Sequence, residues 1–491
     1  MYNPPKLIDE QLRAASAAEK RLYIEASPGS GKTSVAAERF GLLHFGAPAD
    51  GRATLGFTYT RLAAAELRER VRSRWGSAAL RWPNRIDTLD SLLRDILTRL
   101  LRTGQLHWPG GHEELIVSDT WEAWRVRTWQ GRKRRLAPEV RVAESGQIEF
   151  GGPEQFHGPL AEGRCTHDEI RAVIASALDH PVLKTAIADF VRSSVRSVIV
   201  DEAFDVNELD LRILELLCEQ DVSMTLIGDP WQALYEFRGA RPLLAEVLLE
   251  NYGFHPAPLV RSFRFRSAAT RELAEHMREG RPVTIPHWEA DGPLDVALAS
   301  TWKNTWRLGS EILPLSFGRP TSSEKALATL LLNRFASTVL KTEAVFVGDA
   351  LRRLHLPADV DLEEDLDRAL LALREGGLDA VETVAERLVR AVRDAGAATR
   401  LTVTGNFRTY LRDLARRVGS QSAVFIPGLT VHQAKGREWD AVGYLATEQD
   451  LAALRKGLDR NQTDDRVVYV ALTRARHSVS LLTPAVEGRP R

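Results

Sequence analysis

The stretch LYIEASPGSGKT, residues 22–33, decides the fold class of this 491-residue chain. Residues 22–26 are typical of a short strand, residues 27–33 form a glycine-rich loop, and residues 34–43 have the composition of a helix. This order is typical of a phosphate-binding loop, whose backbone N–H groups surround phosphates at a helix N-terminus. Ala26 replaces the usual first glycine, which is a small change. The alternative is a Gly/Ser turn with a chance GKT.

The loop also predicts how its side chains act on a nucleotide. Lys32 would reach the β- and γ-phosphates, and the Thr33 hydroxyl would bind Mg²⁺. We therefore expect ATP to be held by Ser27, Pro28, Gly29, Ser30, Gly31, Lys32 and Thr33.

Two later segments predict further strands of a parallel α/β sheet. SVIVDE, residues 197–202, is an apolar strand that ends in two carboxylates, and such sheets bind ligands at the carboxyl ends of their strands. Asp201 would hold Mg²⁺, and Glu202 would orient or deprotonate the attacking water. Asp-Glu alone is a weak signal, but it is strong together with the upstream loop. MTLI, residues 224–227, predicts a third strand, and the GDPWQ after it could by itself be a turn.

Composition limits the class of protein. The length suggests roughly three or four domain-sized parts. The 66 basic residues balance 66 acidic ones, which argues against coating nucleic acid by bulk charge but not against a local groove. Cys165 and Cys218 are too few for a four-cysteine metal site and are expected in the core. We find neither an apolar run near ~20 residues nor a signal-peptide core, so we expect a cytoplasmic protein without membrane contact.

The segment after the third strand resembles a known family. GDPWQALYEFRGA, residues 228–240, is similar to the GDxxQSIYxFRGA motif of UvrD, Rep and PcrA, which are superfamily 1 DNA helicases. Other motifs of that family match in order: LIDEQLRAA (7–15), FTYTRLAAAELRERV (57–71), TLDSLL (88–93), SFRFRS (262–267), TVHQAKGREWDAV (430–442) and DDRVVYVALTRAR (464–476). The matches extend over nearly the whole chain, so a chance resemblance is negligible.

The resemblance implies an α/β fold with two RecA-like P-loop motor domains, each carrying an inserted, mainly helical accessory domain. The first motor domain would comprise residues 1–91 and 186–257, with residues 92–185 inserted. The second would comprise residues 258–336 and 424–491, with a reduced insertion at residues 337–423. We expect a strand at residues 328–334 to complete the second sheet.

The resemblance also assigns roles in ATP hydrolysis. Gln11 and Phe263 would contact adenine, Gln232 would sense the γ-phosphate, and Glu438 would add a nucleotide contact. Arg264 and Arg474 would be arginine fingers, reaching from the second motor domain to the phosphate held by the first. The implied catalytic set is Lys32, Asp201, Glu202, Gln232, Arg264 and Arg474.

A second set of residues matches positions that contact single-stranded DNA: Thr58, Tyr59, Thr60, Tyr235, Phe237, Arg238 and His432. Aromatic faces suit a translocase because stacking tolerates any base and contributes ~1–3 kcal/mol per base. For each aromatic residue taken alone, an ordinary core position is the alternative.

The two predicted insertions have recognisable patterns of their own. Apolar residues at helical spacing over residues 362–373 and 378–392, with a break at Gly376-Gly377, predict an αα-hairpin or a docking face for a partner. In the first insertion, the basic run 132–135 follows Trp121, Trp124 and Trp129. It fits either a nucleic-acid backbone groove or a solvated helix face.

Two residues depart from the family pattern. Phe204 replaces a glutamine that in relatives helps to link nucleotide to DNA, and phenylalanine cannot hydrogen-bond. That link must therefore be rerouted or lost. Ser34 stands where relatives tend to have a basic residue that covers the adenine, which predicts modest nucleotide affinity.

The function implied by the resemblance is a 3′ to 5′ helicase or translocase, with ATP and Mg²⁺ as cofactors. Its substrate would be single-stranded DNA or a duplex with a single-stranded tail. The alternative is a DNA-sensing ATPase subunit that partners a nuclease or other effector and unwinds little by itself. Short chains of this type resemble helicase-like subunits of anti-phage defence systems such as Gabija. RNA is a weaker option as substrate.

Overall fold

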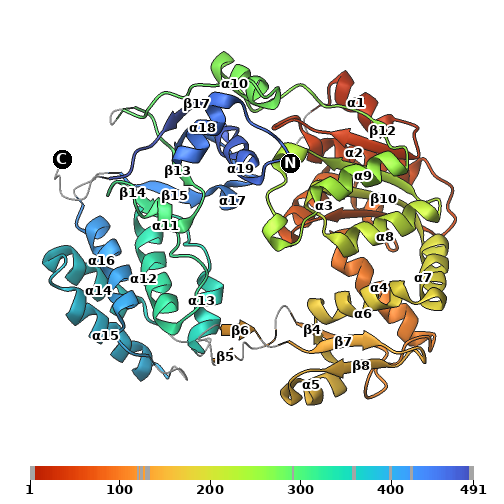
Figure 1. The fold of residues 1–491 in the computed structure, drawn as a ribbon, viewed down its shortest axis with the longest axis horizontal. Helices are drawn as coiled ribbons and strands as arrows, with labels where there is room; N and C mark the ends of the chain where they lie inside the picture. The colour runs from red at the N-terminus through yellow and green to blue at the C-terminus, as the bar shows by residue number, and fades with distance from the viewer. Residues whose placement is uncertain are drawn as a thin grey trace. The chain divides into compact units, whose positions relative to one another are not determined.

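The chain forms two compact units, Met1–Phe263 (unit 1) and Arg264–Arg491 (unit 2). The structure, a computed structural model, describes residues 6–118, 121, 125–127, 133–135, 137–289, 292–356, 361–396, 401–420 and 424–485. Each unit is built on a parallel sheet with helices packed against it (Figure 1). The predicted pair of α/β motor domains is thereby confirmed at the level of fold class.

Unit 1 contains a parallel sheet of six strands. Their order is β12 (His255–Pro256), β1 (Arg21–Glu25), β11 (Ser223–Gly228), β10 (Val195–Asp201), β2 (Ala53–Thr58) and β3 (Arg85–Thr88). The strands predicted at residues 22–26, 197–200 and 224–227 are confirmed as β1, β10 and β11, which are neighbours. The segments that follow these three strands therefore leave the sheet at one edge.

Helices cover both faces of this sheet because side chains alternate along its strands. Ile199 packs against α1 (Asp9–Ser16), α2 (Lys32–Phe45) and α3 (Arg61–Trp75). Val198 and Val200 pack on the other side, with α4 (Leu89–Arg102), α8 (Glu208–Glu219) and α9 (Pro242–Asn251).

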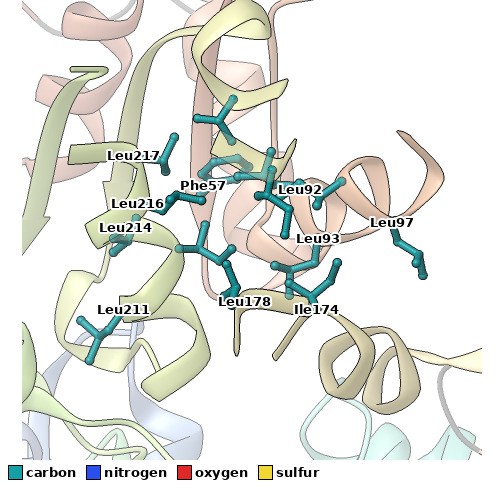
Figure 2. Close-up of a cluster of buried hydrophobic side chains, with 14 of the residues drawn as sticks. Phe57, Leu92, Leu93, Leu97, Ile174, Leu178, Leu211, Leu214, Leu216 and Leu217 are labelled. Atoms are coloured by element: carbon teal, nitrogen blue, oxygen red, sulfur yellow. The ribbon is translucent and has the colours of Figure 1, made fainter. Parts of the chain in front are cut away.

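A helix from the predicted first insertion shares the core of the second face. Figure 2 shows apolar side chains of α4, α8 and α6 (His167–Asp179) meeting around Phe57 of β2. Ile174 and Leu178 are the α6 members labelled there. Because α6 is packed into this core, it is positioned by the same side chains as α4 and α8.

The segment predicted as a mainly helical first insertion also contains short strands. They are β4 (Ile116–Ser118), β5 (Arg125–Arg127), β6 (Lys133–Arg135), β7 (Glu139–Val142), β8 (Ile148–Gly151) and β9 (Arg164–Thr166), with helices α5 (His157–Ala161), α6 and α7 (Pro181–Ser194). Trp124, Trp129 and Arg132 lie outside the described residues. The rest of the basic run is β6, paired antiparallel with β5, so it does not form a helix face.

Unit 2 contains a parallel sheet of five strands, and one predicted strand was wrong. The order is β14 (Ile312–Pro314), β15 (Ile426–Thr430), β13 (Val296–Ala299), β16 (Trp439–Leu445) and β17 (Ala475–Leu481). Residues 328–334, expected as a strand, lie inside α12 (Ser323–Val339), which the Ser322 hydroxyl caps. Most of this helix is buried, and an apolar run buried on all sides cannot be distinguished from a strand by periodicity.

The remaining helices of unit 2 include the predicted hairpin. The helices are α10 (Ala268–Arg278), α11 (Trp302–Thr305), α13 (Val347–Leu354), α14 (Glu363–Gly376), α15 (Val381–Asp394), α16 (Gly405–Val418), α17 (Val431–Ala434), α18 (Glu448–Lys456) and α19 (Thr463–Leu472). Helices α14 and α15 pack together and are separated at Gly377, whose φ is 54°, so the αα-hairpin is confirmed. Cys165 and Cys218 are buried, as expected. Within the described ranges, no helix is long and apolar enough to span a membrane.

Candidate nucleotide and single-strand sites

The predicted phosphate loop joins β1 to α2. Gly29 and Gly31 have φ of 74° and 81°, in the left-handed region that favours glycine. Helix α2 begins at Lys32, directly after Gly31, and no side chain in the described structure caps it. The first N–H groups of α2 therefore have the arrangement with which helix N-termini bind phosphate.

Two residues predicted to contact adenine lie against this loop. Gln11 is buried; its Nε2 donates to Ser30 O at 2.8 Å, and its Oε1 accepts from Ile8 N at 3.1 Å. A Cβ at Gly31 would lie 2.5 Å from Gln11 Nε2, so this glycine is required for the close approach as well as for its φ. Phe263 donates its N–H to Gly29 O at 2.9 Å, and its ring is half-exposed.

The predicted carboxylates stand at the end of β10, between β11 and β2. Asp201 is the last residue of the strand, and its Oδ1 accepts from Glu202 N at 3.0 Å. Glu202 has φ 59° and ψ 46°, a left-handed conformation that costs free energy for a residue other than glycine. Its carboxylate forms an ion pair with Lys32 Nζ. Strain of this kind concentrates at functional sites, and here it holds an acidic side chain against the loop lysine.

The chemistry of Thr33 and Asp201 fits Mg²⁺, which prefers oxygen ligands. Within the described part of the chain, no group of three or more His, Cys, Asp or Glu side chains could hold a metal ion by itself. Magnesium sites commonly combine one or two carboxylates with water and substrate phosphates. These two side chains therefore suit an ion that arrives with a nucleotide.

Gln232 is oriented by a residue that the sequence analysis did not select. Asp229 follows β11 directly and accepts Trp231 N through Oδ1 at 3.2 Å and Gln232 Nε2 through Oδ2 at 2.8 Å. Asp229 and Gln232 are both buried. The carboxylate thus fixes the position of the amide beside the ends of β10 and β1. Its place directly after a predicted strand was the available signal.

A basic side chain from another helix lies beside Ser34, the position at which relatives tend to have a basic residue of their own. Arg70 of α3 donates from Nη1 to Ser34 Oγ at 2.9 Å and forms an ion pair with Glu66. Helix α3 is far from Ser34 in the sequence, so no local pattern could have identified this contact. The modest nucleotide affinity expected from Ser34 remains a prediction.

Phe204 has become a core residue. It is buried, and its ring meets that of Tyr23 edge-on at 5.9 Å. A Cβ at Gly228 would lie 2.8 Å from the Phe204 ring, so the glycine at the end of β11 leaves room for it. The backbone beyond Phe204 is tied to the segment after Phe237 instead, because Arg241 N donates to Val206 O at 2.9 Å.

Three residues predicted to stack on bases form one cluster in unit 1. The rings of Tyr59 and Tyr235 are stacked at 5.1 Å and 12°, and Phe237 lies 6.1 Å from Tyr235. The Arg238 guanidinium lies over Tyr235 and Phe237, at 5.2 and 5.4 Å from the ring centres. Phe237 is 67% exposed. We call Tyr59, Tyr235, Phe237 and Arg238 the aromatic platform.

The two threonines that flank Tyr59 have structural roles. Thr60 caps α3, since its Oγ1 accepts from Ala63 N at 3.1 Å, and Thr58 Oγ1 donates to Thr60 O at 3.0 Å. These bonds fix the turn that carries Tyr59. Contacts of either hydroxyl with DNA remain a prediction.

The other predicted residues belong to unit 2, where three of them gather at the starts of β16 and β17. Arg264 Nε donates to Glu438 Oε2 at 2.8 Å, and its Nη1 donates to Thr473 O at 2.9 Å. Arg474 is buried, with its Nε on Val470 O at 3.0 Å. Arg476, not predicted, shares Glu438 through a 2.7 Å bond from Nη2.

These bonds also lower the pKa of Glu438. Burial by itself would raise the pKa of Glu438, but hydrogen bonds from Arg476 and Arg264 outweigh it and the pKa is lowered. His432, the predicted strand contact of unit 2, lies in the short helix α17 after β15.

Comparisons with known proteins find similar sequences among helicases. Two protein-family models match: the UvrD/REP helicase N-terminal domain over residues 7–130 and 165–252, and the UvrD-like helicase C-terminal domain over residues 385–483. ATP-dependent DNA helicase UvrD2 of Mycobacterium tuberculosis (strain CDC 1551 / Oshkosh) is 25% identical over 560 aligned positions, covering 97% of this chain and 78% of that protein. DNA helicase IV of Escherichia coli (strain K12) is 26% identical, covering 50% of this chain and 42% of that protein. ATP-dependent DNA helicase PcrA of Bacillus subtilis (strain 168) is 24% identical, covering 47% of this chain and 33% of that protein.

Proposed function

Because this chain belongs to the UvrD/Rep group of superfamily 1 DNA helicases, we propose that it uses ATP to move 3′ to 5′ along single-stranded DNA. The chain is an ATP-hydrolysing enzyme of that family. Duplexes with a single-stranded tail are the proposed substrates for unwinding. The observation that carries the proposal is that a phosphate loop, a strained carboxylate and an aromatic platform follow neighbouring strands at one edge of the unit 1 sheet.

The nucleotide roles follow from the chemistry of each group. The loop and Lys32 bind the phosphates, Gln232 contacts the γ-phosphate, and Glu202 accepts a proton from the attacking water. Thr33 and Asp201 would hold Mg²⁺, which would supply positive charge against the phosphates. Phe263, half-exposed beside the loop, is the proposed stacking partner of adenine. Gln11 also supports Ser30, and its amide keeps a second N–H and a second oxygen lone pair for the contact with adenine.

The aromatic platform is the proposed contact with unpaired bases, and Phe237 offers the most exposed ring. Phe237→Ala is expected to weaken binding of an oligo(dT) strand by roughly 5- to 150-fold, the equivalent of ~1–3 kcal/mol per stacked base. Fluorescence anisotropy of a labelled strand measures this. Phe45→Ala is the matched control, because Phe45 is also half-exposed but packs on Trp75 outside the platform. An equal loss in both variants would contradict the assignment.

Two observations favour a second candidate function, a DNA-sensing ATPase subunit that acts with another protein. Phe204 removes a polar side chain from the segment that follows the carboxylates. In unit 2, a cavity of about 260 Å³ lies between α14 and α15, lined equally by apolar residues such as Ala369 and Leu388 and by charged residues such as Arg387 and Asp394. A cavity with this lining suits a partner side chain that combines apolar and charged atoms.

One experiment separates the two functions. ATP hydrolysis is measured with and without oligo(dT), alongside strand separation on duplexes with a 3′ or a 5′ tail. Stimulated hydrolysis together with opening of the 3′-tailed duplex supports the helicase. Stimulated hydrolysis without strand separation supports the sensing subunit. No hydrolysis with any DNA would refute both.

A further inference from the structure

Arg171 of α6 joins two other helices of unit 1. Its guanidinium donates to Asp210 Oδ1 of α8 from Nη1 at 2.9 Å and Nη2 at 2.5 Å, and Nη1 lies 3.2 Å from Asp90 Oδ1 of α4. We propose that Arg171 is a positioning residue that couples DNA binding to ATP hydrolysis. The proposal rests on the proposed function, because it assigns the route between the two sites of that function.

The ion pair of Arg171 with Asp210 fixes the start of α8. The Asp210 side chain is 7% exposed. Asp210 and Asn207 also cap this helix reciprocally, through Asn207 N to Asp210 Oδ2 and Asp210 N to Asn207 Oδ1, each at 3.1 Å. Only the 3₁₀ turn Ala203–Asp205 and one further residue separate Glu202 from Asn207. A shift of the α8 N-terminus is therefore transmitted over a short path to the strained Glu202.

The ion pair of Arg171 with Asp90 lies near the ends of β3 and β2, beside the aromatic platform. Asp90 lies in the first turn of α4, which begins directly after Thr88 of β3. Thr88 is the register partner of Thr58, and Thr58 directly precedes Tyr59. A DNA strand that displaces the turn at Tyr59 therefore acts on the neighbouring start of α4, to which Asp90 belongs.

A backbone connection completes a ring of contacts. Tyr235 stacks on Tyr59, Ala240 N donates to Tyr235 O at 3.2 Å, and Ala240 pairs with Asn207 in an antiparallel bridge. The platform is thus linked to Asn207 twice, once through Ala240 and once through the ion pairs of Arg171. With Phe204 unable to hydrogen-bond, Arg171 supplies a polar link by another path.

The arginine itself is a poor site for the test. Removing it would leave the buried Asp210 carboxylate without its ion pair, which is strongly destabilising. Asp90 is a better site for the substitution, because Asp90→Asn keeps the ion pair of Arg171 and Asp210. Asp179→Asn is a matched control: Asp179 also forms an ion pair between α6 and α8, with Arg212 Nη2 at 2.6 Å, and within the described residues it forms no ion pair with α4.

The test compares wild type, Asp90→Asn and Asp179→Asn as full chains, with oligo(dT) as the probe. Four quantities are measured: ATPase rate without DNA, maximal stimulation by oligo(dT), oligo(dT) affinity without nucleotide, and melting temperature. Asp90→Asn is expected to lower maximal stimulation by ~5-fold or more, the lower range of allosteric coupling, and to leave the other three near wild type. Asp179→Asn is expected to keep wild-type stimulation.

The outcomes distinguish this inference from the proposed function. If wild-type hydrolysis does not respond to oligo(dT), the proposed function fails and the coupling with it. If wild type responds and Asp90→Asn responds equally, only the coupling role of Arg171 is overturned. It is also overturned if Asp90→Asn lowers DNA affinity, basal rate and melting temperature together, because that pattern indicates a purely structural role.

Discussion

Glu202→Gln is expected to reduce ATP hydrolysis by ~10²-fold or more while ATP binding is retained. Glutamine has nearly the same size as glutamate and can still accept a hydrogen bond from Lys32, but it cannot take a proton from the attacking water. General-base catalysis contributes ~10²–10⁴-fold to a rate. The variant should therefore lose turnover without losing the geometry of the loop.

The measurement is ATP turnover with saturating oligo(dT), together with titration of a fluorescent ATP analogue. Glu219→Gln is the control, because it makes the same charge change at the far end of α8, where Glu219 pairs with Lys184 at 3.6 Å. Turnover of Glu202→Gln within a few fold of wild type would show that another group accepts the proton. Loss of both turnover and binding would instead assign Glu202 a role in holding Lys32.

The sequence predicted the central part of unit 1 because its signals are local. A short apolar strand, glycines with positive φ and a helix start are encoded within the twelve residues of LYIEASPGSGKT. The strands at 197–200 and 224–227 were recognisable because each ends in polar residues at the edge where parallel sheets bind ligands. The placement of Gln11 and Phe263 beside the loop came from the family resemblance instead.

The wrong predictions concern segments whose secondary structure is decided by burial or by tertiary contacts. Residues 328–332 are buried without a break in α12, so their pattern carried no helical period. The short strands between α4 and α6 pair partly over long separations, as β4 does with β9, and no local turn signal marks such pairs.

Several site residues were missed for the same reason. Arg70, Arg171 and Arg476 are ordinary surface-type residues in the sequence. They become informative only when folding brings Ser34, Asp210 or Glu438 next to them.

Arg264→Lys is expected to lower ATP turnover by ~10³-fold or more, the lower end of the range for arginine fingers. The Glu438 carboxylate and the Thr473 carbonyl orient the Arg264 guanidinium. Lysine keeps the charge but presents one ammonium in place of a planar fork, so it cannot hold both groups and still face a phosphoryl oxygen. The measurement is turnover at saturating ATP and oligo(dT).

Arg476→Lys is the matched control, because Arg476 shares Glu438 with Arg264 but has no assigned role at the phosphate. It is expected to keep turnover within a few fold of wild type. Arg474 is less suitable for the test, because it is buried with its Nε on Val470 O, and its replacement would lower stability as well as rate. If Arg264→Lys and Arg476→Lys lose turnover equally, the common cause is Glu438, and Arg264 is then a partner of that carboxylate. A large loss in Arg264→Lys alone, with an unchanged melting temperature, assigns the guanidinium to the transition state.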